Sequence, residues 1–584
     1  MEKLWHIYPH DAAEIDSLAR RAGVSPLVAQ LLILRGVTRH DSVARFLDPK
    51  LTFLNEPERL PGCIQAVEIL HKAIQCGRRI VVYGDYDVDG MTGCAILHRG
   101  LSLLGATVEH YLPSRVEEGY GLHETSIRRL AKERNADIII TVDCGITSVR
   151  EAQVAKECGV TLIITDHHEP NAVLPEAAAV VHPRVPVGVY PFADLSGAGV
   201  AWKLALALCQ RVAGQKKVSP RMRDFLLQAI GLASLGTICD MVPLVDENRV
   251  LVKSGLHSLF NCPPVGLAKL MQITELDRKT SLESEDVAFI LGPRINAAGR
   301  LGQAPLALEL LLTEKPGRAS ELAAYIHNLN ESRQTLERSM NRAANAMIRE
   351  RFDPDNDPVF VLAEYGWNPG VVGLVAGRIA ERYHRPVVMI SLDETGIKPG
   401  SGSARSIPRF DIRAALEACQ EHLLGFGGHK AAAGLRIRPE KVDALRDALR
   451  QYAFEHLTDE QARGRIDIEA EAPFSVLTYQ TVRQLERLAP FGQGNKRPLV
   501  YTSGVTVDGP LKTMGSGDAH LSLSLRQHNQ RFRAVAFRRA EWHEPLENCD
   551  SPIDVAFHPV INTWQGRSSV QLQLVDWRVS TRAG

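Results

Sequence analysis

The sequence has few cysteines for its length, and none of them form a close pair. Ten cysteines are scattered singly through 584 residues, from Cys63 to Cys549, and there is no Cys-x-x-Cys pair. This spacing favours neither a zinc ribbon nor a disulfide framework.

Long apolar runs and an excess of charge of one sign are also missing. The N-terminus, Met1–His6, has no basic segment followed by an apolar stretch, and no later run approaches the length of a membrane span. We therefore expect a cytoplasmic protein. The 68 basic residues equal the 68 acidic ones, so net charge argues neither for nor against a nucleic-acid partner.

One stretch does carry an unusual pattern. An apolar, β-rich run at 79–84 breaks at Gly84 and continues into three alternating aspartates, Asp85, Asp87 and Asp89. Three carboxylates so close together repel one another unless a cation neutralises them. The stretch therefore predicts a strand that ends in a metal site.

Two other interpretations of these aspartates are weaker. An EF-hand calcium loop also begins Asp-x-Asp-x-Asp-Gly, but it needs a glutamate six residues after the glycine, where this chain has Ile96. A calcium loop also follows a helix, whereas a strand is expected here. The interpretation as an ordinary surface turn rich in carboxylates is weakened because similar strand ends recur downstream.

The recurrence follows a βαβ pattern. The apolar run 137–142 ends at Asp143, and the run 160–164 is followed by Asp166, His167 and His168. Strands separated by helices predict a parallel sheet whose ligand crevice lies at the carboxyl ends of the strands. A fourth candidate, Asp240, ends the apolar helical stretch 231–239. It is predicted as a ligand only because the three acidic strand ends are also present.

These candidate ligands are carboxylates and imidazoles. Such ligands suit Mn²⁺ or Mg²⁺ better than a metal bound by thiolates. A site with this many carboxylates can hold two cations ~3.5–4 Å apart, a geometry that serves phosphoester hydrolysis. Two divalent cations, Mn²⁺ or Mg²⁺, are therefore the predicted cofactors.

Three further stretches have the composition of phosphate-binding segments. A predicted loop at 292–300 carries Arg294, Asn296 and Arg300 among small residues, and glycine-rich loops are predicted at 400–406 and 425–434. Glycine-rich backbone with Ser, Arg, His and Lys can direct N–H groups and cations at oxyanions, although such segments also form simple turns. Between them, residues 320–350 have the apolar spacing of one long helix.

After about residue 462 the pattern changes to short alternating strands with one helix, which fits a small barrel of the OB type. This region is rich in arginine, with Phe532, Phe537 and Trp564 among the arginines. The arginines are Arg463, Arg465, Arg483, Arg487, Arg497, Arg526, Arg531, Arg533, Arg538 and Arg539. A groove for single-stranded nucleic acid and a merely solvated basic face both fit this composition.

The whole pattern predicts a multidomain α/β protein. We expect a helical N-terminal cap at 1–50, a parallel-sheet metal-binding catalytic domain at 51–312 and a long connector helix at 313–352. A second α/β domain for substrate binding should occupy 353–461, and an OB-like nucleic-acid-binding barrel 462–584.

Four short motifs, in chain order, carry a resemblance to a known superfamily. Asp85-Tyr86-Asp87-Val88-Asp89-Gly90, Asp143-Cys144-Gly145, Asp166-His167-His168 and Cys239-Asp240 resemble the motifs of the DHH phosphoesterases, and Gly427-Gly428-His429 resembles the associated second domain of that superfamily. Segments 292–300, 327–330 and 402–406, with the terminal OB-like region, resemble its bacterial single-strand exonucleases.

The resemblance implies roles for individual residues. One cation would be held by Asp85, Asp87 and Asp143, and a second by Asp89, Asp143, His167 and Asp240, with Asp143 bridging. His168 would face the scissile phosphate, and Asp166 would orient the imidazoles. Arg115, Ser403 and Arg405 would hold the 5′-phosphate, and Arg294, Asn296, Arg300, Gly428 and His429 would contact DNA.

The resemblance also implies the activity and the partners. The expected reaction is metal-dependent 5′→3′ exonucleolytic hydrolysis of single-stranded DNA to 5′-mononucleotides, in recombination and repair. A monomer is expected, with single-strand binding protein and a RecQ-type helicase as partners. Two other functions share the motifs. A DHH enzyme for small substrates would not need the terminal barrel, and a non-catalytic binding relative would have lost ligands.

Overall fold

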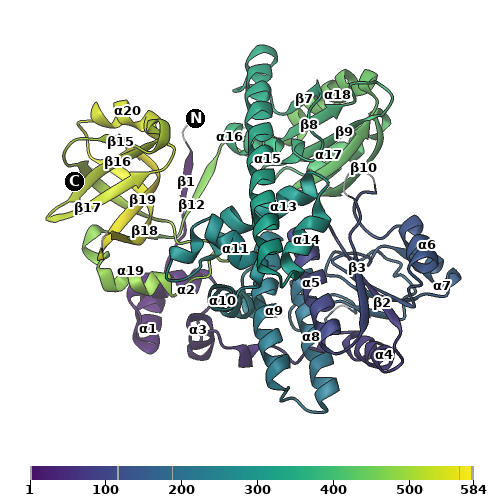
Figure 1. Ribbon diagram of the computed structural model, residues 1–584. Helices are drawn as coiled ribbons and strands as arrows, with labels where there is room; N and C mark the ends of the chain where they lie inside the picture. Colours follow the sequence, from purple (N-terminus) through teal and green to yellow (C-terminus); the bar gives the residue numbers. More distant parts are fainter. Residues whose placement is uncertain (1–2, 115–117, 187, 459, 565, 581–584) are drawn as a thin grey trace.

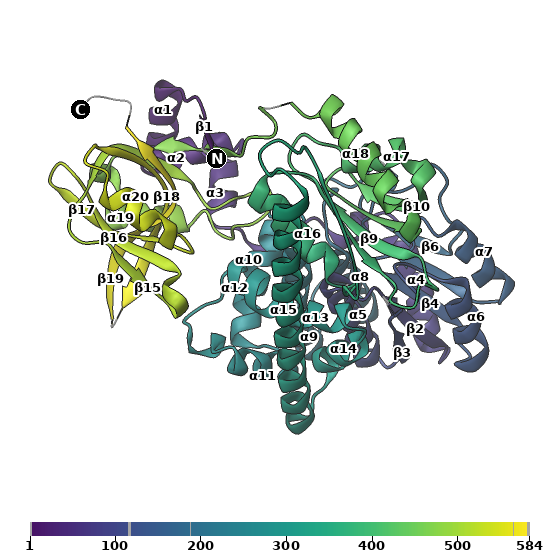
Figure 2. The same ribbon diagram turned by 90° about the horizontal axis from the view of Figure 1, so that it is seen from above.

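The computed structural model describes residues 3–114, 118–186, 188–458, 460–564 and 566–580. Two α/β domains lie beside a long helix, α15 (Pro316–Arg351), and a β-barrel lies off to one side, at the left of Figures 1 and 2. The predicted fold class is thereby confirmed. Among the helices described, none combines the length and the apolar character needed to cross a bilayer.

The first domain is built on a five-stranded parallel sheet in the order β3-β2-β4-β5-β6. The strands are β2 (Arg79–Gly84), β3 (Thr107–Tyr111), β4 (Ile138–Val142), β5 (Thr161–Thr165) and β6 (Ala179–Val181). All five residues of β4 are buried, as expected for a central strand covered on both faces. Because Gly84 pairs with Val142, the residues that follow β2 and β4 emerge side by side.

Helices cover both faces of this sheet. On one face lie α4 (Cys63–Gln75), α5 (Val88–Leu103) and α8 (Gly197–Ala213), and on the other α6 (Glu124–Glu133) and α7 (Val149–Glu157). Helix α9 (Pro220–Cys239) packs on α5 and α8 within the largest apolar core. This packing brings the C-terminal end of α9 to the carboxyl edge of the sheet.

The stretch predicted to be a loop at 292–300 is helical, so that prediction was wrong. A π-helical turn (Val287–Leu291) leads directly into α13 (Gly292–Arg300). The small residues that suggested a loop serve close packing instead. A Cβ atom on Gly299 would lie 2.4 Å from the carbonyl oxygen of Tyr86, inside the aspartate loop.

The second α/β domain has a five-stranded sheet in the order β10-β11-β9-β8-β7. Its strands are β7 (Phe360–Tyr365), β8 (Val387–Leu392), β9 (Gly400–Arg405), β10 (Leu423–His429) and β11 (Ala432–Ile437), covered by α16 (Val372–Tyr383), α17 (Ile412–Ala418) and α18 (Val442–His456). The two glycine-rich segments are therefore strands, not loops. A Cβ atom on Gly402 would lie 2.9 Å from Leu435, so glycine there admits a neighbouring side chain.

The C-terminal domain is a closed barrel. Its seven strands run in the order β13-β14-β18-β19-β17-β16-β15, and β14 (Val500–Val507) also pairs with β16 (His520–Gln527). The remaining strands are β13 (Ala470–Glu471), β15 (Lys512–Met514), β17 (Gln530–Ala536), β18 (Ile553–Trp564) and β19 (Arg567–Val579), with α19 (Tyr479–Glu486) beside them. The β14–β16 pairing closes strands β14, β18, β19, β17 and β16 into a barrel, and the short strands β13 and β15 extend it at the sides.

The N-terminal segment is not wholly helical, which corrects the prediction for 1–50. Strand β1 (Leu4–Ile7) precedes α1 (Ala12–Ala22), α2 (Pro26–Leu34) and α3 (His40–Leu47), and it pairs in parallel with β12 (Arg465–Ile468). Strand β12, which we assigned to the barrel, therefore belongs to a separate two-stranded sheet. The apolar faces of α1 and α2 share one core with barrel residues such as Leu485 and Phe557.

Candidate metal centre

The site begins where the central strands end. Asp85 follows β2, Asp143 follows β4 and Asp166 follows β5, and all three are buried. The main-chain N–H of Asp143 donates to the carbonyl of Thr165 at 3.0 Å, which ties the ends of β4 and β5 together. Parallel strands in register thus bring the carboxylates of three separate motifs to one edge of the sheet.

Two aspartates lie at the start of α5. Asp87 caps the helix, and its Oδ1 accepts the N–H of Gly90 at 3.0 Å. Asp89 lies in the first turn, where its carboxylate accepts the N–H groups of Gly197 and Ala198 at 2.6 and 3.0 Å. These donors open α8, whose N-terminal dipole also favours a negative charge.

Glycine is required where two helices approach these carboxylates. A Cβ atom on Gly236 of α9 would lie 2.4 Å from Oδ1 of Asp89, and one on Gly197 would lie 2.8 Å from Oδ1 of Asp143. Helices α8 and α9 therefore pack against the acidic cluster more closely than any residue with a side chain would permit.

Asp166 organises the histidine segment. Its Oδ2 accepts the N–H of Ile146 at 2.9 Å, and its Oδ1 accepts the main-chain N–H groups of His167 and His168 at 2.7 and 3.1 Å. The same Oδ1 lies 2.8 Å from the ring Nδ1 of His168. Burial opposes the charge on Asp166, but these donors lower its pKa to about 2.

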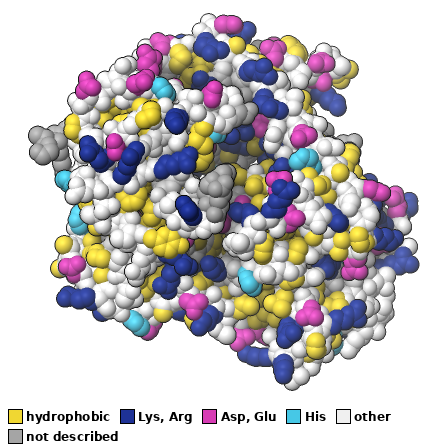
Figure 3. All heavy atoms as spheres, turned by 60° about the vertical axis from the view of Figure 1, so that its left-hand side comes forward, with side chains coloured by type: hydrophobic (Ala, Val, Ile, Leu, Met, Phe, Trp, Pro, Cys, Tyr) yellow, Lys and Arg dark blue, Asp and Glu magenta, His cyan; other side chains and the backbone are white. Residues whose placement is uncertain are grey.

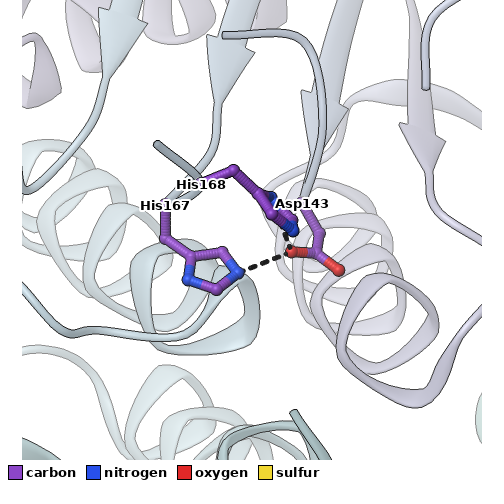
Figure 4. Close-up of side chains that lie close together, drawn as sticks. All are labelled: Asp143, His167 and His168. Carbon is purple, nitrogen blue, oxygen red and sulfur yellow. Dashed lines mark ion pairs between the residues drawn. The ribbon is translucent and has the colours of Figure 1, made fainter. Parts of the chain in front are cut away.

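The two imidazoles converge on Asp143. His167 Nε2 lies 3.0 Å from Asp143 Oδ1, and His168 Nδ1 lies 3.8 Å from the same oxygen, as Figure 4 shows. Burial lowers the pKa of His167 to about 3, so this ring is neutral, as a metal ligand must be. His168 differs: burial opposes its charge, but the Asp166 carboxylate raises its pKa to about 9.

Three overlapping groups have ligand atoms within 4.8 Å of one another. They are Asp85 with Asp87 and Asp143, Asp89 with His167 and Asp240, and Asp143 with His167 and His168. The structure thus brings together every residue predicted as a metal ligand. Asp143 belongs to the first and the third of these groups. His167 connects it to the second group, because His167 Nε2 lies 3.5 Å from Asp240 and 3.8 Å from Asp89.

The electrostatics of the cluster fit a bound cation. Burial and neighbouring carboxylates raise the pKa of Asp89 to about 7, that of Asp240 to about 9 and that of Asp143 well above its usual range. Within the described part of the chain, neither Asp143 Oδ1 nor His167 Nε2 has a hydrogen-bonding partner, although both atoms are buried. Buried, unsatisfied oxygen and imidazole donors are the set that Mn²⁺ or Mg²⁺ would complete.

One residue at the site escaped the sequence reasoning. The hydroxyl of Tyr120 lies 3.1 Å from the carbonyl oxygen of Asp143 and 3.1 Å from Nδ1 of His168. The run Gly119-Tyr120-Gly121 was the only sign of it in the sequence. In the structure both glycines have left-handed backbone conformations, with φ of 89° and 98°. An aromatic residue between two such glycines is held in a tight turn.

A second polar cluster lies in the other α/β domain. Arg405 Nη1 donates to Ser403 Oγ at 2.7 Å on β9. Both side chains face the start of α16, since a Cβ atom on Gly373 would lie 2.8 Å from Arg405 Nη2 and 2.9 Å from Ser403 Oγ. Arg115, the third residue predicted to hold a terminal phosphate, lies outside the described residues.

The other predicted DNA-binding residues are spread over three places. Arg294 donates to His327 Nδ1 at 3.2 Å and to the carbonyl of Ile290 at 2.7 Å. Arg300 donates to the carbonyl of Gly370 at 3.2 Å and so bridges the two α/β domains. Gly428, with φ of 141°, and the exposed His429 end strand β10.

A large cavity separates the first domain from the barrel. Its volume is about 1180 Å³, and its lining includes Cys239 beside the acidic cluster, Asn296 and Arg300 of α13, and Arg497 near the barrel. One end of the cavity thus lies beside the candidate metal centre, at Cys239, although no predicted metal ligand among the described residues lines it, and the other end lies beside the C-terminal domain.

The barrel presents arginines on one side. Arg531 and Arg533 are exposed on β17. Arg526 is exposed on the neighbouring strand β16, directly opposite Arg531. Residues two apart on a strand point the same way, so these three guanidinium groups share a face. In the view of Figure 3, Lys and Arg side chains are interspersed with Asp and Glu.

Three family models match the chain in order. The DHH family N-terminal domain matches residues 79–230, the DHHA1 domain matches 356–455 and the RecJ OB domain matches 468–576. Each match covers one of the three sheet-containing domains.

Named relatives and solved structures match over nearly the whole chain. The single-stranded-DNA-specific exonuclease RecJ of Bacillus subtilis (strain 168) is 37% identical over 577 residues, which is 99% of this chain and 71% of that protein. The crystal structure of RecJ with Mn²⁺ from Thermus thermophilus superposes with a TM-score of 0.82 at 33% identity, covering 99% of this chain and 80% of that one. The Mg²⁺ complex of RecJ from the same organism gives a TM-score of 0.77 at 31% identity, with 99% and 79% covered.

Proposed function

The chain belongs to the RecJ family of single-stranded-DNA-specific exonucleases, and from this premise we propose that it hydrolyses single-stranded DNA from the 5′ end with two divalent cations. The observation that supports this most strongly is the shared carboxylate. Asp143 belongs both to the group with Asp85 and Asp87 and to the histidine group, and His167 connects it to Asp89 and Asp240.

We assign one cation to Asp85, Asp87 and Asp143, and the other to Asp89, Asp143, His167 and Asp240. Mn²⁺ or Mg²⁺ bound by these residues would supply an activated water and would neutralise the charge that develops on the phosphate. The protein contributes preorganisation: α8 and α9 hold the carboxylates from one side, and Asp166 holds both histidines from the other. To His168, which is half-buried beside Asp166, we assign the contact with the scissile phosphate.

The 5′ polarity requires a second contact. We place the terminal phosphate between Arg405, Ser403 and the start of α16, because a guanidinium, a hydroxyl and the positive end of a helix dipole all favour a phosphate dianion. Arg300 lies beside this pocket through its bond to Gly370. A terminal phosphate held in one lobe and a scissile phosphate held in the other would set the register of cleavage.

The barrel would hold the strand that follows. The arginine face on β16 and β17 supplies a sequence-independent attraction for phosphates, and the cavity beside α13 leads toward the metal centre. A DHH enzyme for small substrates would have no use for this domain. The family resemblance further supports action as a monomer, in recombination and repair, with single-strand binding protein and a RecQ-type helicase as partners.

The test is degradation of end-labelled DNA. Single- and double-stranded substrates labelled at either end are incubated with Mn²⁺ or Mg²⁺, and product sizes are followed over time. We expect mononucleotides from the 5′ end of single strands only. Release from the 3′ end, internal cuts or equal digestion of duplexes would contradict the proposal.

A further inference from the structure

Tyr120 occupies a position between two parts of the metal centre. Its hydroxyl is 3.1 Å from the carbonyl oxygen of Asp143 and 3.1 Å from Nδ1 of His168. Its ring meets the His168 ring edge to face, with centroids 5.5 Å apart. The side chain is nevertheless 48% exposed, so packing alone does not explain its position.

The hydrogen positions follow from the donors available. A hydroxyl has one hydrogen, and the carbonyl of Asp143 can only accept, so Tyr120 donates there. Toward His168 the tyrosine oxygen must then accept, which requires the hydrogen on Nδ1. The Asp166 carboxylate, 2.8 Å from the same Nδ1, requires the same arrangement. The second ring nitrogen, Nε2, is left for the substrate side.

The contact with Asp143 holds the main chain of that residue. Asp143 has a φ of 64°, a left-handed conformation that is uncommon for residues other than glycine, although aspartate adopts it more readily than most. Its main chain is held on both sides. The N–H of Asp143 is held by Thr165, and its carbonyl is held by Tyr120.

The turn that carries Tyr120 is itself anchored on both sides. The carboxylate of Glu118 accepts from the hydroxyl of Tyr111 at 2.8 Å, from Ser126 Oγ at 2.5 Å and from the N–H of Ser114 at 2.8 Å. On the other side, the hydroxyl of Tyr83 donates to the carbonyl of Gly121 at 3.0 Å. The residues on either side of Tyr120 are therefore held by contacts outside the metal centre.

We propose that Tyr120 is a positioning residue of the exonuclease reaction, whose hydroxyl fixes the main chain of Asp143 and the ring of His168 relative to each other. It acts through those two residues and contacts neither cation nor substrate in this role. The inference rests on the proposed function, because His168 is taken to face the scissile phosphate.

Tyr120→Phe tests this role, because it removes the hydroxyl and keeps the ring. We expect kcat on single-stranded oligonucleotides to fall about 10- to 100-fold while KM stays within about twofold. In protein without DNA, Mn²⁺ affinity measured by electron paramagnetic resonance should fall about tenfold, because Asp143 is held less firmly. Tyr325→Phe, at a tyrosine of similar exposure (43%) on α15, should change neither quantity.

The outcomes separate the alternatives. A kcat within about twofold of wild type would overturn the proposal. A rise in KM at unchanged kcat would make Tyr120 a substrate contact and would overturn it too, and unchanged Mn²⁺ affinity would overturn the Asp143 part. If the wild-type protein degraded no DNA, the proposed function would fail, but the Mn²⁺ measurement would still test the hold on Asp143.

Discussion

The Nε2 atom of His167 lies 3.0 Å from Oδ1 of Asp143, yet neither atom has a hydrogen-bonding partner among the described residues. The pKa of His167 is lowered to about 3 by burial, so the ring is neutral and no ion pair holds the two together. A divalent cation that took both atoms as ligands would satisfy them.

Removing the shared carboxylate should abolish turnover. Asparagine tolerates the left-handed backbone of residue 143, so Asp143→Asn changes the charge and preserves the conformation. We expect hydrolysis of labelled single strands to fall by at least about 10³-fold in Mn²⁺. The control is Asp224→Asn, an exposed aspartate of α9 with a side chain 70% exposed. Near-normal turnover in a folded Asp143→Asn protein would contradict the bridging role.

The metal-free protein should lose stability as pH rises from 7 to 9. Asp89 and Asp240 have folded-state pKa values of about 7 and about 9, raised by burial and neighbouring carboxylates. The unfolded value is about 3.9, so the folded state binds more protons across this range and the free energy of unfolding falls with pH. His168, with its pKa raised to about 9, acts in the same direction.

The measurement is the first thermal unfolding midpoint in EDTA between pH 7 and 9. Asp240→Asn should flatten the dependence, and Asp224→Asn should leave it unchanged. Saturating Mn²⁺ should remove the pH dependence of the midpoint, because the cation takes the place of the protons on the carboxylates. For the same reason, Mn²⁺ affinity should rise with pH. A midpoint that rises with pH in EDTA would mean that the carboxylates are ionised without a cation.

Loss of the guanidinium at 405 should remove the preference for a 5′-phosphate. Arg405→Ala deletes the charge that lies beside Ser403 and the start of α16. We expect similar rates on 5′-phosphorylated and 5′-hydroxyl strands, with Mn²⁺ affinity unchanged. Arg436→Ala, at an exposed arginine of the adjacent strand β11, is the matched control. A variant that kept the full wild-type ratio would place the phosphate pocket elsewhere.

The basic face of the barrel should appear in the salt dependence of binding. Replacing Arg526, Arg531 and Arg533 with alanine removes three cations from one face. Each lost phosphate contact should reduce the slope of log affinity against log salt by about 0.7 for a single strand. A fluorescence titration at several salt concentrations measures this slope. An unchanged slope would make these arginines a solvated surface.

Much of the metal centre could be predicted because parallel strands impose it. Asp85, Asp143 and Asp166 each follow an apolar strand, and the carboxyl ends of such strands share one edge. Asp240 was a weaker prediction, since a carboxylate after a helix usually caps it, and only packing of α9 against α5 brings it to the site. The full ligand set was assigned through family motifs.

Other features depend on contacts that no local pattern encodes. Tyr120 reaches Asp143 and His168 from a turn 23 and 48 residues away. The glycines at 400–406 and 425–434 indicated loops because glycine is common in turns, but in β9 Gly402 makes room for Leu435. Strand β1 has only four residues, and its partner Arg465–Ile468 lies in the last quarter of the chain.

The pairing of β1 with β12 also constrains how the molecule can form during synthesis. The apolar faces of α1 and α2 are buried against barrel residues beyond 470, so this core cannot close until the C-terminal domain has left the ribosome. At ~5–20 residues per second, translation of the intervening ~430 residues takes ~20–90 s. Throughout that interval the apolar faces of α1 and α2 lack the surface that buries them in the folded protein. Helices α1 and α2 therefore complete their packing only after the barrel has been made, although they precede it by more than 400 residues in the chain.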